Sequence, residues 1–170
     1  MTRAALPKEL RRELARAGVE AALPASCDPD RIPGTPGAYA LILNLERSVH
    51  VDRPSRAAGA LPAGWYVYAG SARGPGGIRA RLARHFRAEK RLHWHIDQLT
   101  CVPEVRLWAS PAPDIRAPGI RECDLVAKMI RSGVFRTALP GFGSSDCRRC
   151  EGHLLAWRAK RKPSAAARGT

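Results

Sequence analysis

The 170-residue sequence has no long run of apolar side chains. Its longest apolar stretches, around residues 39–45 and 64–69, fall far short of the roughly twenty consecutive apolar residues that a membrane-spanning helix needs. Charged residues between positions 9 and 13 interrupt the N-terminal segment, which therefore also lacks the continuous apolar core of a secretion signal. We expect a protein that neither spans a membrane nor is exported.

Acidic residues are scarce as well. The sequence holds 15 Asp and Glu against 29 Lys and Arg, which gives a formal net charge of +14. A field of this sign concentrates polyanions at the protein surface and speeds encounters with them. Nucleic acid and anionic membrane surfaces are therefore the natural partners, and the net charge alone does not decide between them.

The sequence contains five cysteines, an odd number that does not suit a framework of disulfides. Two of them stand close together in Cys147-Arg-Arg-Cys150. Free or metal-bound thiols in a reducing compartment explain this usage better than disulfides do, so we expect a cytoplasmic protein.

The same cysteine pair has the spacing of zinc ligands. His153 follows Cys150 by three residues, and Cys123 is available as a fourth ligand, so these residues can form a structural zinc site. Buried thiols with a capping histidine explain the pattern equally well. The sequence leaves both interpretations open.

Composition divides the chain into three parts. Residues 1–36 contain an expected short amphipathic helix over 7–17, followed by a linker rich in Pro and Gly. Residues 37–157 carry the apolar periodicity of one folded domain. Residues 158–170 form a basic tail without apolar periodicity, which we expect to be disordered.

Apolar runs within the domain predict its strands, over residues 37–45, 49–51, 65–69 and 104–108. The first two are expected to form a hairpin. Helices are expected over 78–91, where Ile78, Leu82 and Phe86 recur at four-residue spacing, from within 93–99, and over 120–131. Strands and helices do not alternate strictly, which favours an α+β fold with a small, mostly antiparallel, three-stranded central sheet flanked by helices.

Four motifs follow one another along this domain: Gly37-Ala38-Tyr39, Tyr68-Ala69-Gly70, Arg81-Leu82-Ala83-Arg84-His85, and Glu122 near the start of a helix. Their order and spacing resemble the GIY-YIG nuclease superfamily, in which a G-x-Y strand, a Y-x-G strand, an R-L-x-x-H helix and a later glutamate recur. The segments YVYAGSA, HWHID and GFGSSDC are similar to those of an uncharacterised subgroup of that superfamily. Ala38 and Ala69 stand where most members have Ile.

The resemblance implies a metal-dependent hydrolase of phosphodiester bonds in nucleic acid. Glu122 is then the ligand of Mg²⁺ or Mn²⁺, because Mg²⁺ takes only one or two carboxylates from a protein and retains water. Arg81 donates two hydrogen bonds to the phosphate. Tyr39 orients or activates the attacking water, and Tyr68 positions the water or the phosphate. His85 lies on the same helix edge as Arg81 and completes the expected catalytic set.

Basic residues are dense between positions 73 and 91, where seven Lys or Arg accompany one acidic residue. Helical geometry predicts that Arg84 and Arg87 point to solvent. We expect this segment to contact the phosphates of nucleic acid through Arg73, Arg79, Arg84, Arg87, Lys90 and Arg91.

The candidate residues also have ordinary explanations. Strands favour tyrosine for packing, so Tyr39 and Tyr68 can be core aromatics. A glutamate in the first turn of a helix, such as Glu122, is common next to the helix dipole. A nucleic-acid-binding module without turnover, or a protein-interaction adaptor that uses HWHID and GFGSSDC, therefore remain alternatives.

The segment HWHID permits a second interpretation. On a strand, His93, His95 and Asp97 would share one face, as in part of the zinc motif of metallo-β-lactamases. That motif continues with His, whereas this sequence has Gln98. A helical segment in which His93 and Asp97 pair at i, i+4 is therefore favoured.

Overall fold

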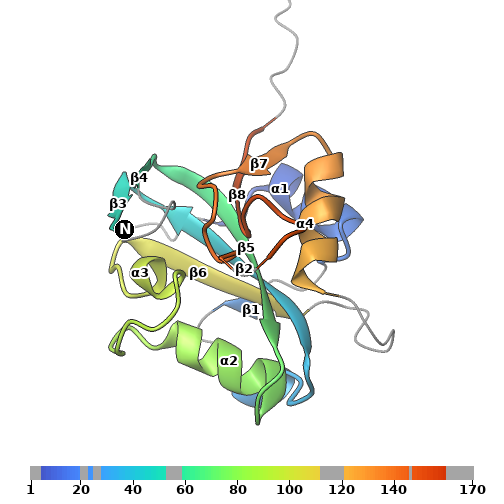
Figure 1. Cartoon of the computed structure of the whole chain (residues 1–170), viewed down its shortest axis with the longest axis vertical. Helices are drawn as coiled ribbons and strands as arrows, with labels where there is room; N and C mark the ends of the chain where they lie inside the picture. The colour runs from blue at the N-terminus through green and yellow to red at the C-terminus, as the bar shows by residue number, and fades with distance from the viewer. Residues whose placement is uncertain are drawn as a thin grey trace, which may run out of the picture.

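The computed structural model describes residues 5–19, 23–24, 28–52, 59–111, 121–145 and 147–159. Figure 1 shows its elements, which are in chain order α1 (Lys8–Arg16), β1 (Leu23–Pro24), η1 (Pro29–Arg31), β2 (Gly37–Leu45), β3 (Val49–Val51), β4 (Gly59–Leu61), β5 (Gly64–Ala72), α2 (Gly77–Phe86), α3 (Asp97–Thr100), β6 (Val105–Pro111), α4 (Glu122–Arg131), β7 (Phe135–Thr137) and β8 (Leu154–Trp157). The predicted α+β class is confirmed.

The main sheet has six strands in the order β1-β6-β2-β5-β8-β7, and all its pairings are antiparallel. It is larger than the three-stranded sheet that the sequence predicted, although three strands, β6, β2 and β5, form its centre. The outer strands β1 and β7 have two and three residues. Strands this short show no periodicity that would identify them in a sequence.

The hairpin predicted between residues 37–45 and 49–51 is wrong. β3 pairs instead with β4 in a separate two-stranded sheet. The reason lies in β2, which pairs with β5 on one edge and with β6 on the other as far as its last residue, Leu45. No edge of β2 is left for β3.

The helices agree with the sequence in place and differ in length. α2 ends at Phe86 and does not continue to residue 91, and α3 is a single turn that begins at Asp97. α4 begins at Glu122, so Glu122 lies in its first turn as expected. Residues 160–170 of the predicted tail lie outside the described residues.

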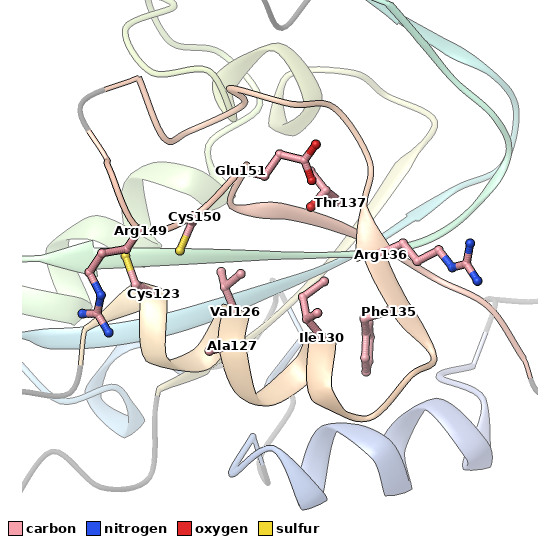
Figure 2. A pocket seen from close by; sticks show the side chains of 10 residues that line it. All are labelled: Cys123, Val126, Ala127, Ile130, Phe135, Arg136, Thr137, Arg149, Cys150 and Glu151. Atoms are coloured by element: carbon pink, nitrogen blue, oxygen red, sulfur yellow. The ribbon is translucent and has the colours of Figure 1, made fainter.

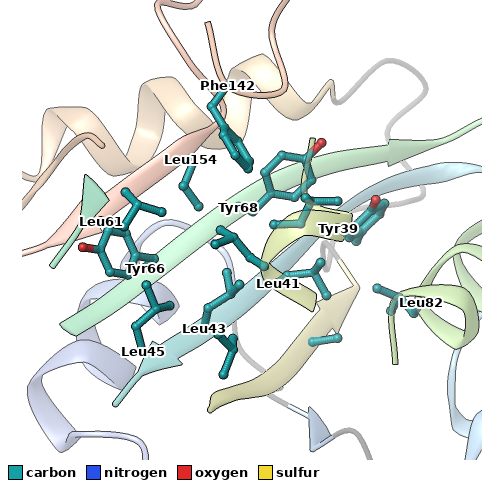
Figure 3. Close-up of a cluster of buried hydrophobic side chains, with 14 of the residues drawn as sticks. Tyr39, Leu41, Leu43, Leu45, Leu61, Tyr66, Tyr68, Leu82, Phe142 and Leu154 are labelled. Carbon is teal, nitrogen blue, oxygen red and sulfur yellow. The ribbon is translucent and has the colours of Figure 1, made fainter. Parts of the chain in front are cut away.

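Both faces of the sheet are buried, which explains why β2 is a continuous apolar run. Its alternate residues Tyr39, Leu41, Leu43 and Leu45 pack with α2 in one core cluster (Figure 3). The intervening residues pack in a second cluster, to which α1 contributes Leu10 and Leu14 and α4 contributes Leu125, Val126 and Met129. Helices therefore cover both faces (Figure 1).

The pairing of β2 with β5 explains the Y-x-G motif. Tyr39 lies opposite Gly70, and a Cβ added at Gly70 would be 2.4 Å from the Cζ atom of Tyr39. The ring of Tyr39 therefore crosses β5 where β5 has no side chain. Tyr68, two residues before Gly70, projects from the same face of the sheet (Figure 3).

Replacing Gly70 by Ala tests this close approach. The added methyl group would overlap the Tyr39 ring, so we expect a loss of about 1–3 kcal/mol in the free energy of unfolding, the usual cost of overpacking. Gly74→Ala is the matched control, because a Cβ there meets no atom within 4 Å. Urea unfolding of both variants measures the difference. Equal midpoints for Gly70→Ala and wild type would contradict this placement of Tyr39.

Candidate functional site

A buried hydrogen bond joins the first strand motif to the helix motif. The Tyr39 hydroxyl, on β2, lies 2.8 Å from Nε2 of His85 in the last turn of α2. The side chain of His85 is almost completely buried, and Tyr39 is 2% exposed. The structure thus brings together two of the four residues that the sequence assigned to catalysis.

Burial lowers the pKa of His85 to about 3, so its imidazole is neutral at physiological pH. Its other nitrogen, Nδ1, lies 3.9 Å from a carboxylate oxygen of Asp97. A nearby carboxylate favours the hydrogen on the nitrogen that faces it, and we assign the hydrogen to Nδ1 for this reason. Nε2 is then free to accept the hydrogen of the Tyr39 hydroxyl.

Asp97, whose side chain lies next to His85, is fully buried. It accepts hydrogen bonds from both terminal nitrogens of Arg84, at 2.8 and 3.0 Å, and from the backbone N–H groups of His93 and Trp94. Burial alone would raise the pKa of Asp97, but these hydrogen bonds hold it below its ordinary value. Asp97 is therefore a carboxylate.

These contacts correct two expectations. Arg84 does not point to solvent, because its guanidinium is bound to Asp97. His93 and Asp97 do interact, but through the backbone of His93 and not through its imidazole. Residues 93–95 precede α3 and are not in a strand, so they have no shared strand face for a zinc motif.

Arg81, the expected phosphate ligand, lies beside this cluster. Its guanidinium carbon is 3.9 Å from the centre of the Trp94 ring, and that of Arg84 is 4.2 Å from it. Such cation–π contacts restrain an arginine without using its hydrogen-bond donors. Arg81 lines a small cleft together with Trp94, Arg84 and the glycine-rich turn before α2.

The pKa of Tyr39 shows which charges lie near its hydroxyl. Burial raises this pKa well above 10, the charges of Tyr68, Asp97 and Glu122 raise it further, and Arg81 lowers it. Tyr39 is therefore a neutral phenol. Tyr68, Arg81 and Glu122 all act on Tyr39 electrostatically, and His85 is hydrogen-bonded to it, so the five expected catalytic and metal-binding residues lie in one region.

One carboxylate oxygen of Glu122 is available to bind a cation or a water molecule. Its Oε2 atom is buried and, within the part of the chain that the structure describes, has no hydrogen-bond partner. Leaving a buried carboxylate oxygen without a partner is costly, so a cation or water is the natural occupant beside it.

The expected phosphate-contacting residues divide into two groups. Arg79 donates to the carbonyl of Ile32, and Lys90 donates to those of His85 and Arg87, so both stabilise local backbone. Arg84 belongs with them, through Asp97. The exposed members that remain for a partner are Arg73, Arg87 and Arg91.

A second cluster lies where α4 meets the segment before β8. Ligand atoms of Cys123, Cys147, Cys150 and His153 all lie within 4.8 Å of one another, an arrangement that can hold a metal such as zinc. This set includes Cys123, the fourth ligand considered from the sequence. Figure 2 shows Cys123 in the first turn of α4 and Cys150 opposite it, at one end of a pocket between α4 and β7.

Sequence reasoning missed the roles of Asp97 and Trp94, although it singled out HWHID. The motif marked the position, but the partners of these two side chains, Arg81 and Arg84, come from another element. Only tertiary packing reveals such pairs.

A protein-family model matches most of the chain. A family model described as "Domain of unknown function DUF123" matches residues 38–169, and neither the curated proteins nor the solved structures gave a match. Among the described residues, no helix is both long and apolar enough to cross a membrane.

The lowered pKa of His85 makes stability depend on pH. The unfolded chain, with a histidine pKa of about 6.5, binds more protons than the folded chain between about pH 6.5 and pH 3, so stability falls as pH falls through this window. From pH 7 to pH 5 we expect His85 to account for a loss of about 2 kcal/mol.

Urea unfolding of His85→Gln at both pH values measures this share, because glutamine does not titrate. The loss between pH 7 and pH 5 should be smaller than in wild type by about that amount. His50→Gln, which changes an exposed histidine on β3, is the control for the substitution of a histidine by glutamine. An unchanged pH dependence in His85→Gln would show that His85 is not buried as a neutral group.

Proposed function

The chain belongs to the DUF123 family, and we propose that it is a metal-dependent phosphodiester hydrolase that acts on nucleic acid. The observation that carries this proposal is the Tyr39–His85 hydrogen bond, close to Arg81 and to the Glu122 oxygen that has no partner among the described residues. In-line hydrolysis of a phosphodiester needs a positioned water, a route for its proton and positive charge near the phosphate. The resemblance to the GIY-YIG nucleases supports the same assignment.

The pair of Tyr39 and His85 provides the proton route. Tyr39 is a neutral phenol that donates its hydrogen to His85, so its oxygen can accept a hydrogen from the attacking water. As the oxygen of the water bonds to phosphorus, its proton passes to Tyr39 and the phenolic proton passes to Nε2 of His85. The opposite P–O bond breaks, and the leaving oxygen takes a proton from solvent. Asp97 faces the other side of the imidazole and partly offsets the cost of charging a buried ring.

Arg81, and a divalent cation held by Glu122, would provide the positive charge. Arg81 would hydrogen-bond the equatorial phosphate oxygens, and its contact with Trp94 keeps its position without occupying its donors. Mg²⁺ or Mn²⁺ held by Glu122 would add positive charge beside the same phosphate. Tyr68 would position the phosphate or the water.

Side chains, and not the start of α2, contact the nucleic-acid backbone in this proposal. The N–H groups of Ile78 and Arg79 in the first turn of α2 donate to the carbonyls of Thr35 and Pro33, so they are not available to a phosphate. The exposed Arg87 and Arg91 follow α2 and extend positive charge away from Arg81.

A non-catalytic nucleic-acid-binding module is the second candidate. One observation favours it: Tyr39 is only 2% exposed, and a phenol so buried meets a substrate water only if the cleft beside Arg81 opens or a water enters it. Cleavage assays separate the two candidates.

We expect the wild-type chain to cleave nucleic acid with Mg²⁺ or Mn²⁺ and to lose cleavage with a chelator. Glu122→Gln should abolish turnover and keep binding, because it removes a ligand and adds no positive charge. Arg81→Ala should lose on the order of a hundredfold in rate, the usual scale for one transition-state contact. Gel-resolved cleavage of labelled single-stranded, double-stranded and branched DNA and RNA measures these rates.

The tyrosines offer a matched control for this assay. Tyr39→Phe removes the hydroxyl that meets His85 and should reduce the cleavage rate as strongly as Arg81→Ala. Tyr66→Phe removes a hydroxyl that donates to the carbonyl of Pro62, outside the site, and should cleave as wild type. Absence of cleavage by wild type, or full activity of Glu122→Gln, would leave the binding module as the function.

Binding should be electrostatic and fall steeply with salt, since arginines contact phosphates and few side chains can read base edges. Replacing Arg87 and Arg91 by Gln should reduce the slope of log affinity against log salt concentration by about 2, because each arginine neutralises one phosphate. The control replaces Arg11 and Arg12, exposed on α1 on the other side of the sheet. A fluorescence anisotropy titration that shows equal slopes would exclude this surface.

A further inference from the structure

Two distances within the Cys3His cluster match those of a zinc site. The sulfur atoms of Cys123 and Cys147 lie 3.3 Å apart, and Cys123 Sγ lies 3.8 Å from Nε2 of His153. A tetrahedral zinc with Zn–S bonds of about 2.3 Å separates its ligand atoms by roughly 3.3–3.8 Å. These two separations match that range, and all four donor atoms lie within 4.8 Å of one another, close enough for small side-chain shifts to bring them around one ion.

A disulfide explains this cluster less well. The Cys123–Cys147 distance of 3.3 Å is well above the roughly 2.05 Å of a sulfur–sulfur bond. Cys123, Cys147 and Cys150 are all free thiols in the structure. Pairing any two would leave the third thiol outside the bridge, whereas zinc can bind all three thiolates and the imidazole.

The ligands come from two segments of the chain. Cys123 is in the first turn of α4, whereas Cys147, Cys150 and His153 belong to the segment before β8. The ion pair between Arg149 and Asp124 also joins these segments, at 3.0 Å. Both its side chains are substantially exposed, and exposed ion pairs contribute little to stability. A metal would be the strong link.

The zinc ligands are connected to two residues of the proposed catalytic site, Glu122 and Tyr68. Glu122 is the residue next to Cys123, so fixing Cys123 fixes the turn that carries the Glu122 carboxylate. On the other side, the backbone of His153 accepts from the N–H of Ala69 and donates to the carbonyl of Phe142. Phe142 packs its ring against Tyr68 at 6.2 Å.

A glycine brings the same segment still closer to Tyr68. Gly143 has a φ of +71°, and a Cβ there would lie 2.6 Å from Cε2 of Tyr68. The segment therefore packs directly on the Tyr68 ring, next to its hydroxyl. Its position and that of the ring depend on each other.

We propose that a zinc ion bound by Cys123, Cys147, Cys150 and His153 positions Glu122 and Tyr68, so that this zinc is required for divalent metal binding at Glu122. The zinc does not touch the substrate and is a positioning element. The assignment of Glu122 and Tyr68 to a reaction rests on the proposed function, but the zinc site and its effect on Glu122 are testable without any cleavage.

The first experiment measures zinc in the full chain by elemental analysis. Wild type and Cys101→Ser should each hold one zinc per chain, because Cys101 lies outside the cluster. Cys147→Ser, which changes a half-buried ligand, should lose it. Substitution of Co²⁺ for zinc should give the visible absorption of a tetrahedral thiolate site in wild type and Cys101→Ser and not in Cys147→Ser. Zinc-free wild type, or a mass two hydrogens short through a disulfide, would overturn the proposal.

The second experiment measures Mn²⁺ binding by electron paramagnetic resonance. Removing zinc from wild type, or Cys147→Ser, should weaken Mn²⁺ binding at least tenfold, and returning zinc should restore it in wild type only. Glu122→Gln should lose Mn²⁺ and keep its zinc. Equal Mn²⁺ affinity with and without zinc would overturn the positioning role even if zinc is bound.

The two proposals fail in different ways. If wild type binds zinc and zinc-dependent Mn²⁺ but cleaves no nucleic acid, the nuclease function is wrong and the positioning role holds. If it cleaves nucleic acid at an unchanged rate after zinc removal, the positioning role is wrong and the nuclease function holds. Near-ultraviolet circular dichroism of Cys147→Ser shows whether the variant is folded, and Zn²⁺-depleted wild type supplies the same comparison if it is not.

Discussion

In the antiparallel pairing of β2 with β5, every residue of one nine-residue strand has a fixed partner on the other. This register places Tyr39 over Gly70 and leaves Tyr68 beside it on the same face. A slip of one residue would turn the side chains of one strand to the opposite face and separate the tyrosines. The burial of both faces prevents such a slip, because it would move large side chains into spaces occupied by alanines.

A buried ion pair extends this arrangement to the helices. Asp97 is surrounded by Arg84 and two backbone donors, so its charge is compensated, and it ties α2 to the segment that carries Trp94. His85 then lies between a phenol and a carboxylate without being charged itself. Two further charged side chains act on Tyr39: Arg81, and Glu122, whose buried Oε2 has no partner among the described residues.

The sequence predicted positions better than it predicted partners. Apolar runs and helical spacing located β2, β5 and α4, because each has enough residues to show its buried faces. The same reasoning wrongly predicted that the Arg84 side chain points to solvent. Helical periodicity describes one helix alone, and Asp97, which binds Arg84, belongs to another element. It also wrongly predicted that β3 pairs with β2. The edge of β2 that such a hairpin needs is occupied by β6, whose pairing the local sequence does not reveal. The tyrosine, histidine and cysteine motifs were recognisable because their members are close in sequence.

The burial of α1 determines where this chain can be truncated without loss of the folded structure. The matched family segment begins at residue 38, yet Leu10 and Leu14 of α1 are almost completely buried against the second core cluster. The unit that folds is therefore longer than the unit that the family model recognises. A fragment that starts at the family boundary would expose the apolar surface beneath α1, and such a surface favours aggregation over a defined monomer. The family boundary and the boundary of the folded unit therefore differ by α1, β1 and η1.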